Sequence, residues 1–151
     1  MSVKAVHFAG PRALLVDLPD LDSVLALHAH LLSNPLPGQL DVLAAAATVL
    51  IQCDTRAHAL AARTAVERLE LGQAPAGTGE TVDIPVIYDG EDLAEVARLT
   101  GLSPEAVVNA HTGQVWTAAF GGFAPGFAYL TGENHLLDVP RRATPRTAVP
   151  A

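Results

Sequence analysis

The stretch GGFAPGFAYL at residues 121–130 combines residues that shape the backbone with aromatic side chains. Glycine lets the backbone approach a ligand closely and adopt positive φ, and proline fixes the neighbouring turn. A strand that ends in such a loop presents N–H groups without ladder partners, and these groups can bind a carboxylate, a phosphate or an oxyanion. We predict an anion-binding loop whose residues are Gly122, Phe123, Pro125, Gly126 and Phe127.

The aromatic residues of this loop allow two interpretations. In the first, Phe123, Phe127 and Tyr129 form the walls of the pocket and keep water away from the ligand. In the second, the same side chains are the core of a C-terminal domain, and the glycines and prolines only shape the turn. Composition alone favours the second interpretation, because short motifs are weak signals of function.

Three arginines crowd into PRRATPR, residues 140–146, of an otherwise acidic chain. Arg141, Arg142 and Arg146 therefore form a second candidate anion site, since the guanidinium group binds carboxylate and phosphate with two parallel hydrogen bonds. We expect this segment and the loop to meet at one site. The alternative is a solvated segment, or one whose arginines pair with Glu133 and Asp138.

His111 is the histidine best placed for proton transfer. It lies at the end of a predicted helix, immediately before Thr112, Gly113 and the strand that leads to the loop. A helix C-terminus favours the imidazolium cation, and a histidine there can act as acid or base. The alternative is a histidine that only caps its helix.

Several common devices are missing from the sequence. No metal-binding spacing such as HExxH, no GxxxxGK[ST] phosphate loop and no GxSxG elbow is present, so we predict no metal site. Cys53 is the only cysteine, which excludes a disulfide framework and favours a reducing compartment. Because the N-terminus lacks the apolar region of a signal peptide, we expect a cytoplasmic protein without membrane contact.

The composition is that of a globular protein. Among the 151 residues, 50% are apolar and 17% are charged, which is unlike a disordered chain. The formal net charge of −7 argues against a nucleic-acid partner, since phosphate binding requires clusters of Lys and Arg. A chain of this length can bury one good core or two small ones.

The pattern of strands and helices in residues 1–71 predicts a small α+β sandwich domain. Two strands joined by Gly10-Pro11, then a helix capped by Asp20 or Asp22, are followed by two buried strands and a helix capped by Asp54 or Thr55. The expected ranges are 3–8 and 13–18 for the first strands, 41–46 and 48–53 for the later ones, and 56–69 for the second helix.

A linker at residues 72–81 separates this domain from a second one at residues 82–151, because the linker is small, polar and rich in Gly and Pro. In the second domain we expect strands at 82–88 and 114–120, helices at 92–99 and 103–110, and an irregular tail from 136. Two strands are too few to close a sheet, so we expect a fragment, or a domain completed by a further segment.

The second domain resembles the allophanate hydrolase subunit 1 family, also called the 5-oxoprolinase B-subunit family. That family includes a sporulation-kinase inhibitor and the carboxyltransferase part of urea amidolyase. The residues that carry the resemblance are Gly122-Phe123, Pro125-Gly126-Phe127, Tyr129-Leu130, Pro140-Arg141-Arg142, Pro145-Arg146 and Val149-Pro150-Ala151, with Ile84-Pro85-Val86, Tyr88-Asp89-Gly90, Asp92-Leu93, Leu102-Ser103 and His111 upstream. LPGQLDVLAAAATVLIQCD, before the linker, resembles a less specific part of the family.

The resemblance implies a fold and a partner. The fold would be a small N-terminal α/β sandwich domain followed by a cyclophilin-like β-barrel, which is truncated here because the family continues past Ala151. The partner would be a second subunit of related fold, of the allophanate hydrolase subunit 2 or 5-oxoprolinase C-subunit type. ATP with Mg would be used by the complex, and the chain has no biotin attachment motif.

The resemblance also implies three candidate functions. The first is a subunit, inactive alone, of an ATP-dependent enzyme that opens 5-oxoproline to glutamate. The second is a component of an allophanate hydrolase or a urea-linked carboxyltransferase, and the third is a binding protein that inhibits a kinase. For the first function, we expect the loop to stabilise an anionic amide oxygen, the arginines to hold a carboxylate or phosphate, His111 to move a proton and Tyr129 to orient the substrate.

Overall fold

The computed structural model describes residues 3–73 and 79–144. The described residues group into two compact units, one drawn from Met1–Gly79 and Ala118–Tyr129, the other from Glu80–Thr117 and Leu130–Ala151. The boundaries expected at residues 71 and 82 stay predictions. No helix among the described residues is both long and apolar enough to span a bilayer.

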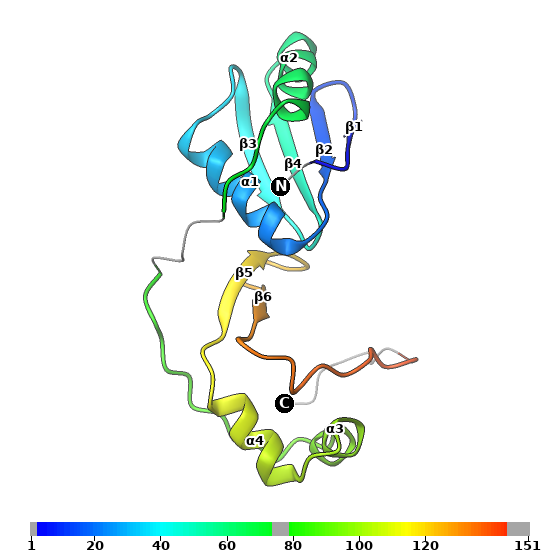
Figure 1. Ribbon diagram of the computed structural model, residues 1–151, viewed down its shortest axis with the longest axis vertical. Helices are drawn as coiled ribbons and strands as arrows, with labels where there is room; N and C mark the ends of the chain where they lie inside the picture. The colour runs from blue at the N-terminus through cyan, green and yellow to red at the C-terminus, as the bar shows by residue number, and fades with distance from the viewer. Residues whose placement is uncertain (1–2, 74–78, 145–151) are drawn as a thin grey trace. The chain divides into compact units, whose positions relative to one another are not determined.

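The N-terminal residues form a four-stranded antiparallel sheet with the order β1-β2-β4-β3 (Figure 1). Its strands are β1 (Ala5–Phe8), β2 (Ala13–Asp17), β3 (Gln39–Ala44) and β4 (Thr48–Cys53). The register of β3 shifts between Gln39 and Asp41. All four strands follow the predicted order, with bounds that differ by a few residues.

Two capped helices complete this part of the chain. They are α1 (Leu21–Ser33) and α2 (Arg56–Glu67). The Asp20 carboxylate accepts a hydrogen bond of 2.8 Å from the backbone N–H of Ser23, and the Thr55 hydroxyl accepts one of 3.2 Å from that of His58. Each cap satisfies an N–H that has no partner inside its helix. Of the caps left open by the sequence, the structure uses Asp20 and Thr55.

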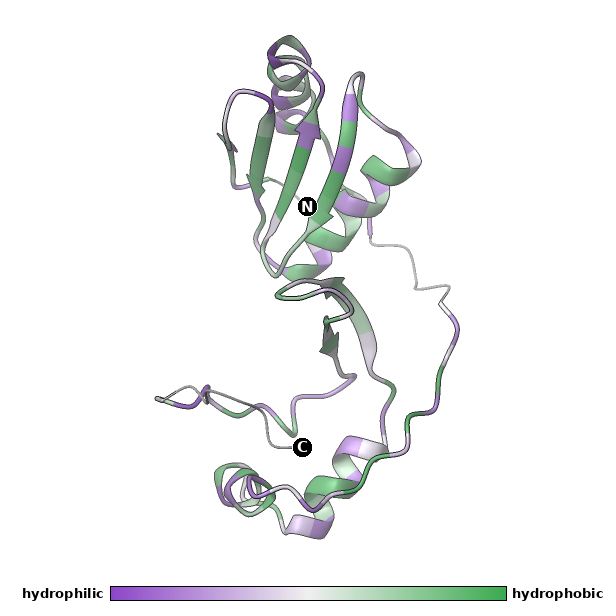
Figure 2. Ribbon diagram, turned by 180° about the vertical axis from the view of Figure 1, so that it is seen from behind, coloured by the Kyte–Doolittle hydropathy of each residue, from purple (hydrophilic) through white to green (hydrophobic). Residues whose placement is uncertain are grey.

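Both helices cover the same face of the sheet and enclose one apolar core. Alternate residues of β2 and β4 are buried in this core. Both central strands are largely apolar (Figure 2). Fully buried members include Leu14, Val16, Leu27, Leu31, Val49 and Ile51. The predicted mixed α and β architecture is confirmed for this part of the chain.

The unit that contains Glu80–Thr117 has two short helices. They are α3 (Leu93–Thr100) and α4 (Pro104–Thr112). The Ser103 hydroxyl accepts from the N–H of Ala106 at 3.1 Å, with Pro104 in the first turn, as the sequence predicts. Ala97 and Val107 are the buried residues of these helices. The two helices therefore pack together through few buried side chains, and the end of α4 carries His111.

The remaining strands differ from the prediction. Residues 82–88 are extended but form no strand, since Pro85 lacks an N–H and no neighbouring strand supplies partners for the others. Strand β5 (Thr117–Gly121) is confirmed, whereas β6 (Ala128–Thr131) lies where the sequence predicts loop. These two strands form a two-stranded sheet, and the described residues contain no closed barrel. The cyclophilin-like barrel stays a prediction.

Helix α1 offers a test of the core. Leu27 is fully buried, and Leu32, on the same helix, is 59% exposed. We expect Leu27→Ala to lower the free energy of unfolding by about 2–5 kcal/mol, because it leaves a cavity. Leu32→Ala should change it by about 0.5 kcal/mol or less. Urea denaturation followed by circular dichroism measures both, and equal losses would contradict the assignment of the core.

The cap of α1 predicts a pH dependence. Hydrogen bonds from Ser23 lower the pKa of Asp20 in the folded protein. The stability that this cap provides is therefore present above about pH 4, the ordinary range of an aspartate, and is lost as the pH falls through the lowered pKa. Asn also caps helices but does not titrate there, so Asp20→Asn should remove this part of the acid dependence. Urea midpoints measured from pH 6 to 2 check it, and parallel curves for both proteins would contradict it.

Candidate functional site

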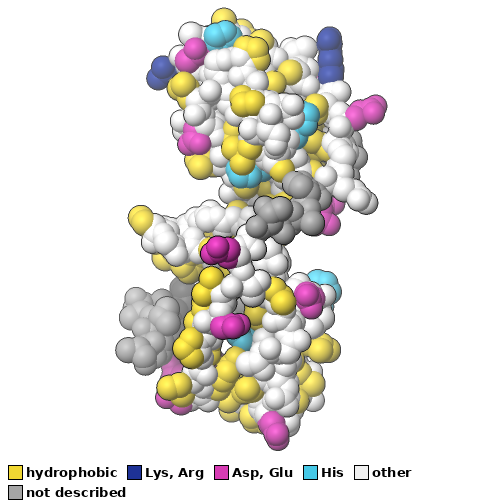
Figure 3. Space-filling model, turned by 90° about the vertical axis from the view of Figure 1, so that its left-hand side faces the viewer, with side chains coloured by type: hydrophobic (Ala, Val, Ile, Leu, Met, Phe, Trp, Pro, Cys, Tyr) yellow, Lys and Arg dark blue, Asp and Glu magenta, His cyan; other side chains and the backbone are white. Residues whose placement is uncertain are grey.

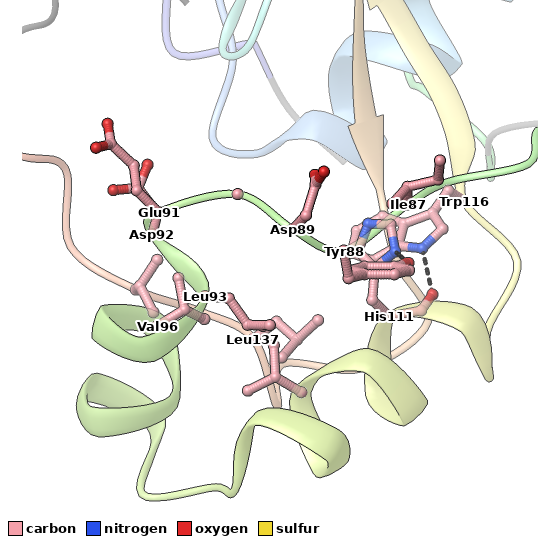
Figure 4. A pocket seen from close by; sticks show the side chains of 13 residues that line it. Ile87, Tyr88, Asp89, Glu91, Asp92, Leu93, Val96, His111, Trp116 and Leu137 are labelled. Carbon is pink, nitrogen blue, oxygen red and sulfur yellow. Dashed lines mark hydrogen bonds between the residues drawn. The ribbon is translucent and has the colours of Figure 1, made fainter. Parts of the chain in front are cut away.

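A pocket of about 650 Å³ lies beside α3 and α4 (Figure 4). A volume of this size suits a small organic ligand. It is formed by the loop before α3, by both helices, by the start of the chain toward β5 and by the segment after β6. The residues that line it are Ile87, Tyr88, Asp89, Gly90, Glu91, Asp92, Leu93, Val96, Val107, His111, Trp116, Leu137 and Val139.

Three aromatic rings meet on one side of the pocket. The Tyr88 hydroxyl lies 2.6 Å from His111 Nδ1, and the Trp116 Nε1–H donates to the His111 carbonyl oxygen at 2.8 Å. The ring centroids are 5.7 Å apart for Tyr88 and His111, edge to face, and 4.9 Å apart for His111 and Trp116. The imidazole is thus held by contacts to both its ring and its backbone.

The local sequence explains why His111 is held so well. Helix α4 ends at Thr112, where its last carbonyl groups have no partner inside the helix. Gly113 closes it with a bond from its N–H to the Asn109 carbonyl, and a Cβ at this position would lie 2.7 Å from that oxygen. The chain then turns at once, so that the Trp116 indole reaches back to the His111 carbonyl.

The Tyr88–His111 hydrogen bond determines what the imidazole can do. If the hydroxyl donates to Nδ1, the ring proton is on Nε2, which then acts as a donor. If Nδ1–H donates to the phenol oxygen, Nε2 carries a lone pair and acts as a base. To pass from the first state to the second, Nε2 loses its proton, Nδ1 gains one and the hydroxyl turns its own hydrogen away, so Nε2 is a donor in one state and a base in the other.

The rest of the pocket divides into an apolar floor and an acidic rim. Figure 4 shows Leu93, Val96 and Leu137 together, with the carboxylates of Asp89 and Glu91 directed away from them. Hydrophobic and acidic side chains also lie side by side on the surface of this unit (Figure 3). An apolar ring fits the floor, whereas an anionic group needs a positive charge near the rim.

A smaller hollow of about 300 Å³ adjoins the pocket and contains two of the predicted arginines. It shares Asp92, Val96 and Val139 with the larger pocket. Arg142 Nη1 lies 2.8 Å from Asp92 Oδ1 and 3.5 Å from Glu95 Oε2. The positive charge of Arg142 is therefore next to the acidic rim, where it pairs with two carboxylates of the α3 region.

The structure distinguishes between the partners that the sequence analysis left open for the arginines. Arg141 is exposed and has no ion pair among the described residues, while Arg146 lies outside them. Pairing with Asp138 and Glu133 is wrong for Arg142, because Asp138 pairs with His135 at 2.9 Å and Arg142 pairs with α3. The predicted role of these arginines in anion binding stays a prediction.

The glycine- and proline-rich loop is the turn between β5 and β6. Phe123 is 90% exposed, and Phe127 and Tyr129 are also exposed, so these side chains are not a buried core. They meet edge to face instead, with ring centroids 5.5 Å apart for Phe123 and Phe127 and 5.2 Å apart for Phe127 and Tyr129. The core interpretation is therefore wrong for this turn.

The backbone of the turn is unusual. Phe123 has a φ of 64°, which a bulky residue rarely adopts, and Gly126 has a φ of 78°. The N–H of Ala124 donates to the Gly122 carbonyl at 2.7 Å and that of Phe127 to the Ala124 carbonyl at 3.0 Å, so part of the predicted N–H array is used within the turn. Pro125 has no N–H to offer.

The structure brings together some of the predicted residues. His111 lies in the pocket, and Arg141 and Arg142 border the adjoining hollow. The turn with Gly122–Phe127 and Tyr129 belongs to the other compact unit and lines neither hollow. The expected meeting of loop and arginines stays a prediction, as do the roles of the turn residues and Tyr129.

Sequence reasoning missed Tyr88, Trp116 and Asp92 as parts of the site. Tyr88 follows a segment that was expected to be a strand, and its pairing with His111 joins positions 23 apart. The one usable signal was the single Trp of the chain, which lies five residues after His111. No cluster of His, Cys, Asp and Glu within residues 3–73 and 79–144 could hold a metal ion.

Replacing Tyr88 tests the support of His111. Tyr88→Phe keeps the ring but removes the hydroxyl, so we expect a loss of about 1 kcal/mol in the free energy of unfolding and a changed tautomer balance of His111. Tyr129→Phe is the control, since the Tyr129 hydroxyl has no hydrogen bond among the described residues. Urea denaturation and imidazole ¹⁵N chemical shifts give the two readouts. Unchanged His111 shifts in Tyr88→Phe would contradict the pairing.

The chain is similar to bacterial proteins named as the B subunit of 5-oxoprolinase. It is 46% identical to that of Haemophilus influenzae over 76 residues, 45% to that of Bacillus subtilis over 73 and 43% to that of Escherichia coli O157:H7 over 94. The matches cover 48%, 46% and 58% of this chain and 36%, 30% and 43% of the relatives. The chain therefore matches less than half the length of each relative.

A solved structure and a family match agree with this similarity. The crystal structure of TTHA0988 in space group P212121 has a TM-score of 0.66 at 35% identity, covering 93% of this chain and 29% of that one. Residues 4–151 match the family described as carboxyltransferase domain, subdomain C and D. The chain belongs to this carboxyltransferase-domain family, which confirms the resemblance to allophanate hydrolase subunit 1 and to the B subunit of 5-oxoprolinase.

Proposed function

We propose that this protein acts as a subunit of a 5-oxoprolinase, which opens 5-oxoproline to glutamate. The observation that carries the proposal is the 43–46% identity to three proteins named as the B subunit of that enzyme. The pocket around Tyr88 and His111 supports it, since it is large enough for a five-membered ring and has an apolar floor on which the ring can lie.

The chemistry follows from what the pocket offers. Opening 5-oxoproline breaks the amide C–N bond and adds water, so a proton must leave the attacking water and another must reach the departing nitrogen. His111 Nε2 can perform both transfers if its state changes between the steps, and Tyr88 supports each state through Nδ1. Trp116 keeps the ring in place through the His111 carbonyl.

The residues that line this pocket include no Lys or Arg, which a triphosphate would need in addition to Mg. The carboxylates of Asp89, Glu91 and Asp92 would repel the phosphates wherever Mg did not lie between them. We propose that ATP with Mg is a co-substrate of the whole complex, bound outside this pocket.

The complex would include a second subunit of the same enzyme. The relatives are named as subunits, and the chain matches under half of each relative. The predicted cyclophilin-like barrel would then be completed by segments beyond the described residues. We propose that the protein is inactive alone, in a cytoplasmic complex that uses no biotin and no nucleic acid.

A binding function is the second candidate, and the β5–β6 turn favours it. Phe123 is 90% exposed with a left-handed φ of 64°, a conformation that costs stability and is typical of functional sites. Under this candidate, which includes inhibition of a kinase, the aromatic turn contacts a partner protein and the pocket performs no chemistry.

Turnover by the full-length protein with its second subunit separates these functions. We expect glutamate release from 5-oxoproline that depends on ATP, and a fall of about 10²–10⁴ in kcat for His111→Ala. His135→Ala is the matched control, since His135 is exposed and pairs with Asp138 outside the pocket. Absence of glutamate from the wild-type complex would contradict the proposed function. Equal activity of His111→Ala and wild type would contradict the role of His111.

A further inference from the structure

The ion pairs of Arg142 with Asp92 and Glu95 have a geometry that allows another carboxylate to replace them. Both of its carboxylate contacts use Nη1, at 2.8 Å to Asp92 and 3.5 Å to Glu95. A guanidinium binds a single carboxylate best through two parallel N–H bonds from two nitrogens. The internal pairing is therefore poorer than the one that a well-placed ligand carboxylate would make.

The surroundings of the ion pair also favour exchange. The side chains of Arg142, Asp92 and Glu95 are each 43–50% exposed, so water stabilises them when they separate. Residues 137–143, which carry Arg142, contain no helix or strand, and Leu137 is their one half-buried residue. Little structure has to change for the guanidinium to move.

The position of Asp92 links this ion pair to the pocket. Asp92 borders both hollows, and Val96 and Val139 also belong to both. A ligand ring on the apolar floor would bring an attached carboxylate to this shared wall, beside the acidic rim. The same acidic rim would repel that carboxylate unless Arg142 turned toward it.

We propose that Asp92 and Glu95 compete with the carboxylate of the ligand for binding to Arg142. Without ligand, they hold Arg142, whose charge offsets one of the negative charges of the rim. When a small carboxylate-bearing amide binds, its carboxylate takes Arg142 from them, so the net affinity is the difference between the two pairings. The choice of ligand rests on the proposed function, whereas the competition itself does not.

If Asp92 and Glu95 compete with the ligand, removing their charges should strengthen ligand binding. If their ion pair with Arg142 were only structural, the same change should weaken binding or leave it unchanged. Asp92→Asn with Glu95→Gln frees Arg142 and removes the repulsion, so the full-length protein should bind 5-oxoproline about five- to tenfold more tightly. Its affinity for 2-pyrrolidinone, the same ring without the carboxylate, should stay unchanged. Arg142→Gln should weaken 5-oxoproline binding by about tenfold or more and leave 2-pyrrolidinone binding unchanged.

Calorimetric titration of each variant with both ligands provides the test. Asp89→Asn is the control, because it removes a rim charge that has no ion pair with Arg142. Circular dichroism verifies that each variant is folded. If the unmodified protein binds 5-oxoproline, weaker or equal binding by the Asp92→Asn, Glu95→Gln protein would overturn the competition, as would an equal gain in Asp89→Asn.

A second readout separates this inference from the proposed function. Acetate carries a carboxylate, and acetamide is its neutral counterpart. Their effects on the Arg142 side-chain ¹⁵N–¹H signals test the competition without assuming which substrate the protein binds. If 5-oxoproline does not bind but acetate shifts Arg142, and does so more strongly in the double variant, the competition holds and the proposed substrate is wrong. If acetate leaves Arg142 unchanged in both proteins, the competition is overturned.

Discussion

The pocket depends on the hydrogen bond between the Tyr88 hydroxyl and His111 Nδ1. At 2.6 Å it joins the loop before α3 to the end of α4, two segments that would otherwise share only a small apolar contact. The Trp116 indole adds a bond to the His111 carbonyl, where the helix has no partner of its own. The imidazole is thus fixed in position through its Nδ1 atom and through the backbone that carries it.

Charge explains the rest of the site. Asp89, Glu91 and Asp92 border an apolar pocket, and these charges by themselves would repel the anionic substrate that we propose. Arg142 offsets this charge while it pairs with Asp92 and Glu95. Because the pairing is exposed and uses one nitrogen, it stabilises the fold only slightly. It is better suited to selecting a ligand than to holding the chain together.

Local signals predicted most of the N-terminal fold, because strands with alternating apolar residues and helices with Asp20 and Thr55 caps are encoded in short windows. The site was predicted only in part. His111 was found from its place at a helix end, but Tyr88 lies in a segment whose apolar residues imitate a strand, and its partner is distant in the sequence. The aromatic turn is not a buried core, because a two-stranded sheet has no interior, while its role as a pocket wall stays a prediction.

The central claim is that the small amide binds beside His111 and not at the turn. The most direct measurement is a titration of the isotope-labelled full-length protein with 5-oxoproline, following backbone and side-chain NMR signals of every assigned residue. The account predicts that the largest changes occur at Tyr88, His111 and Trp116 and saturate together. Changes confined to residues 122–127, or no saturable change near His111, would contradict it.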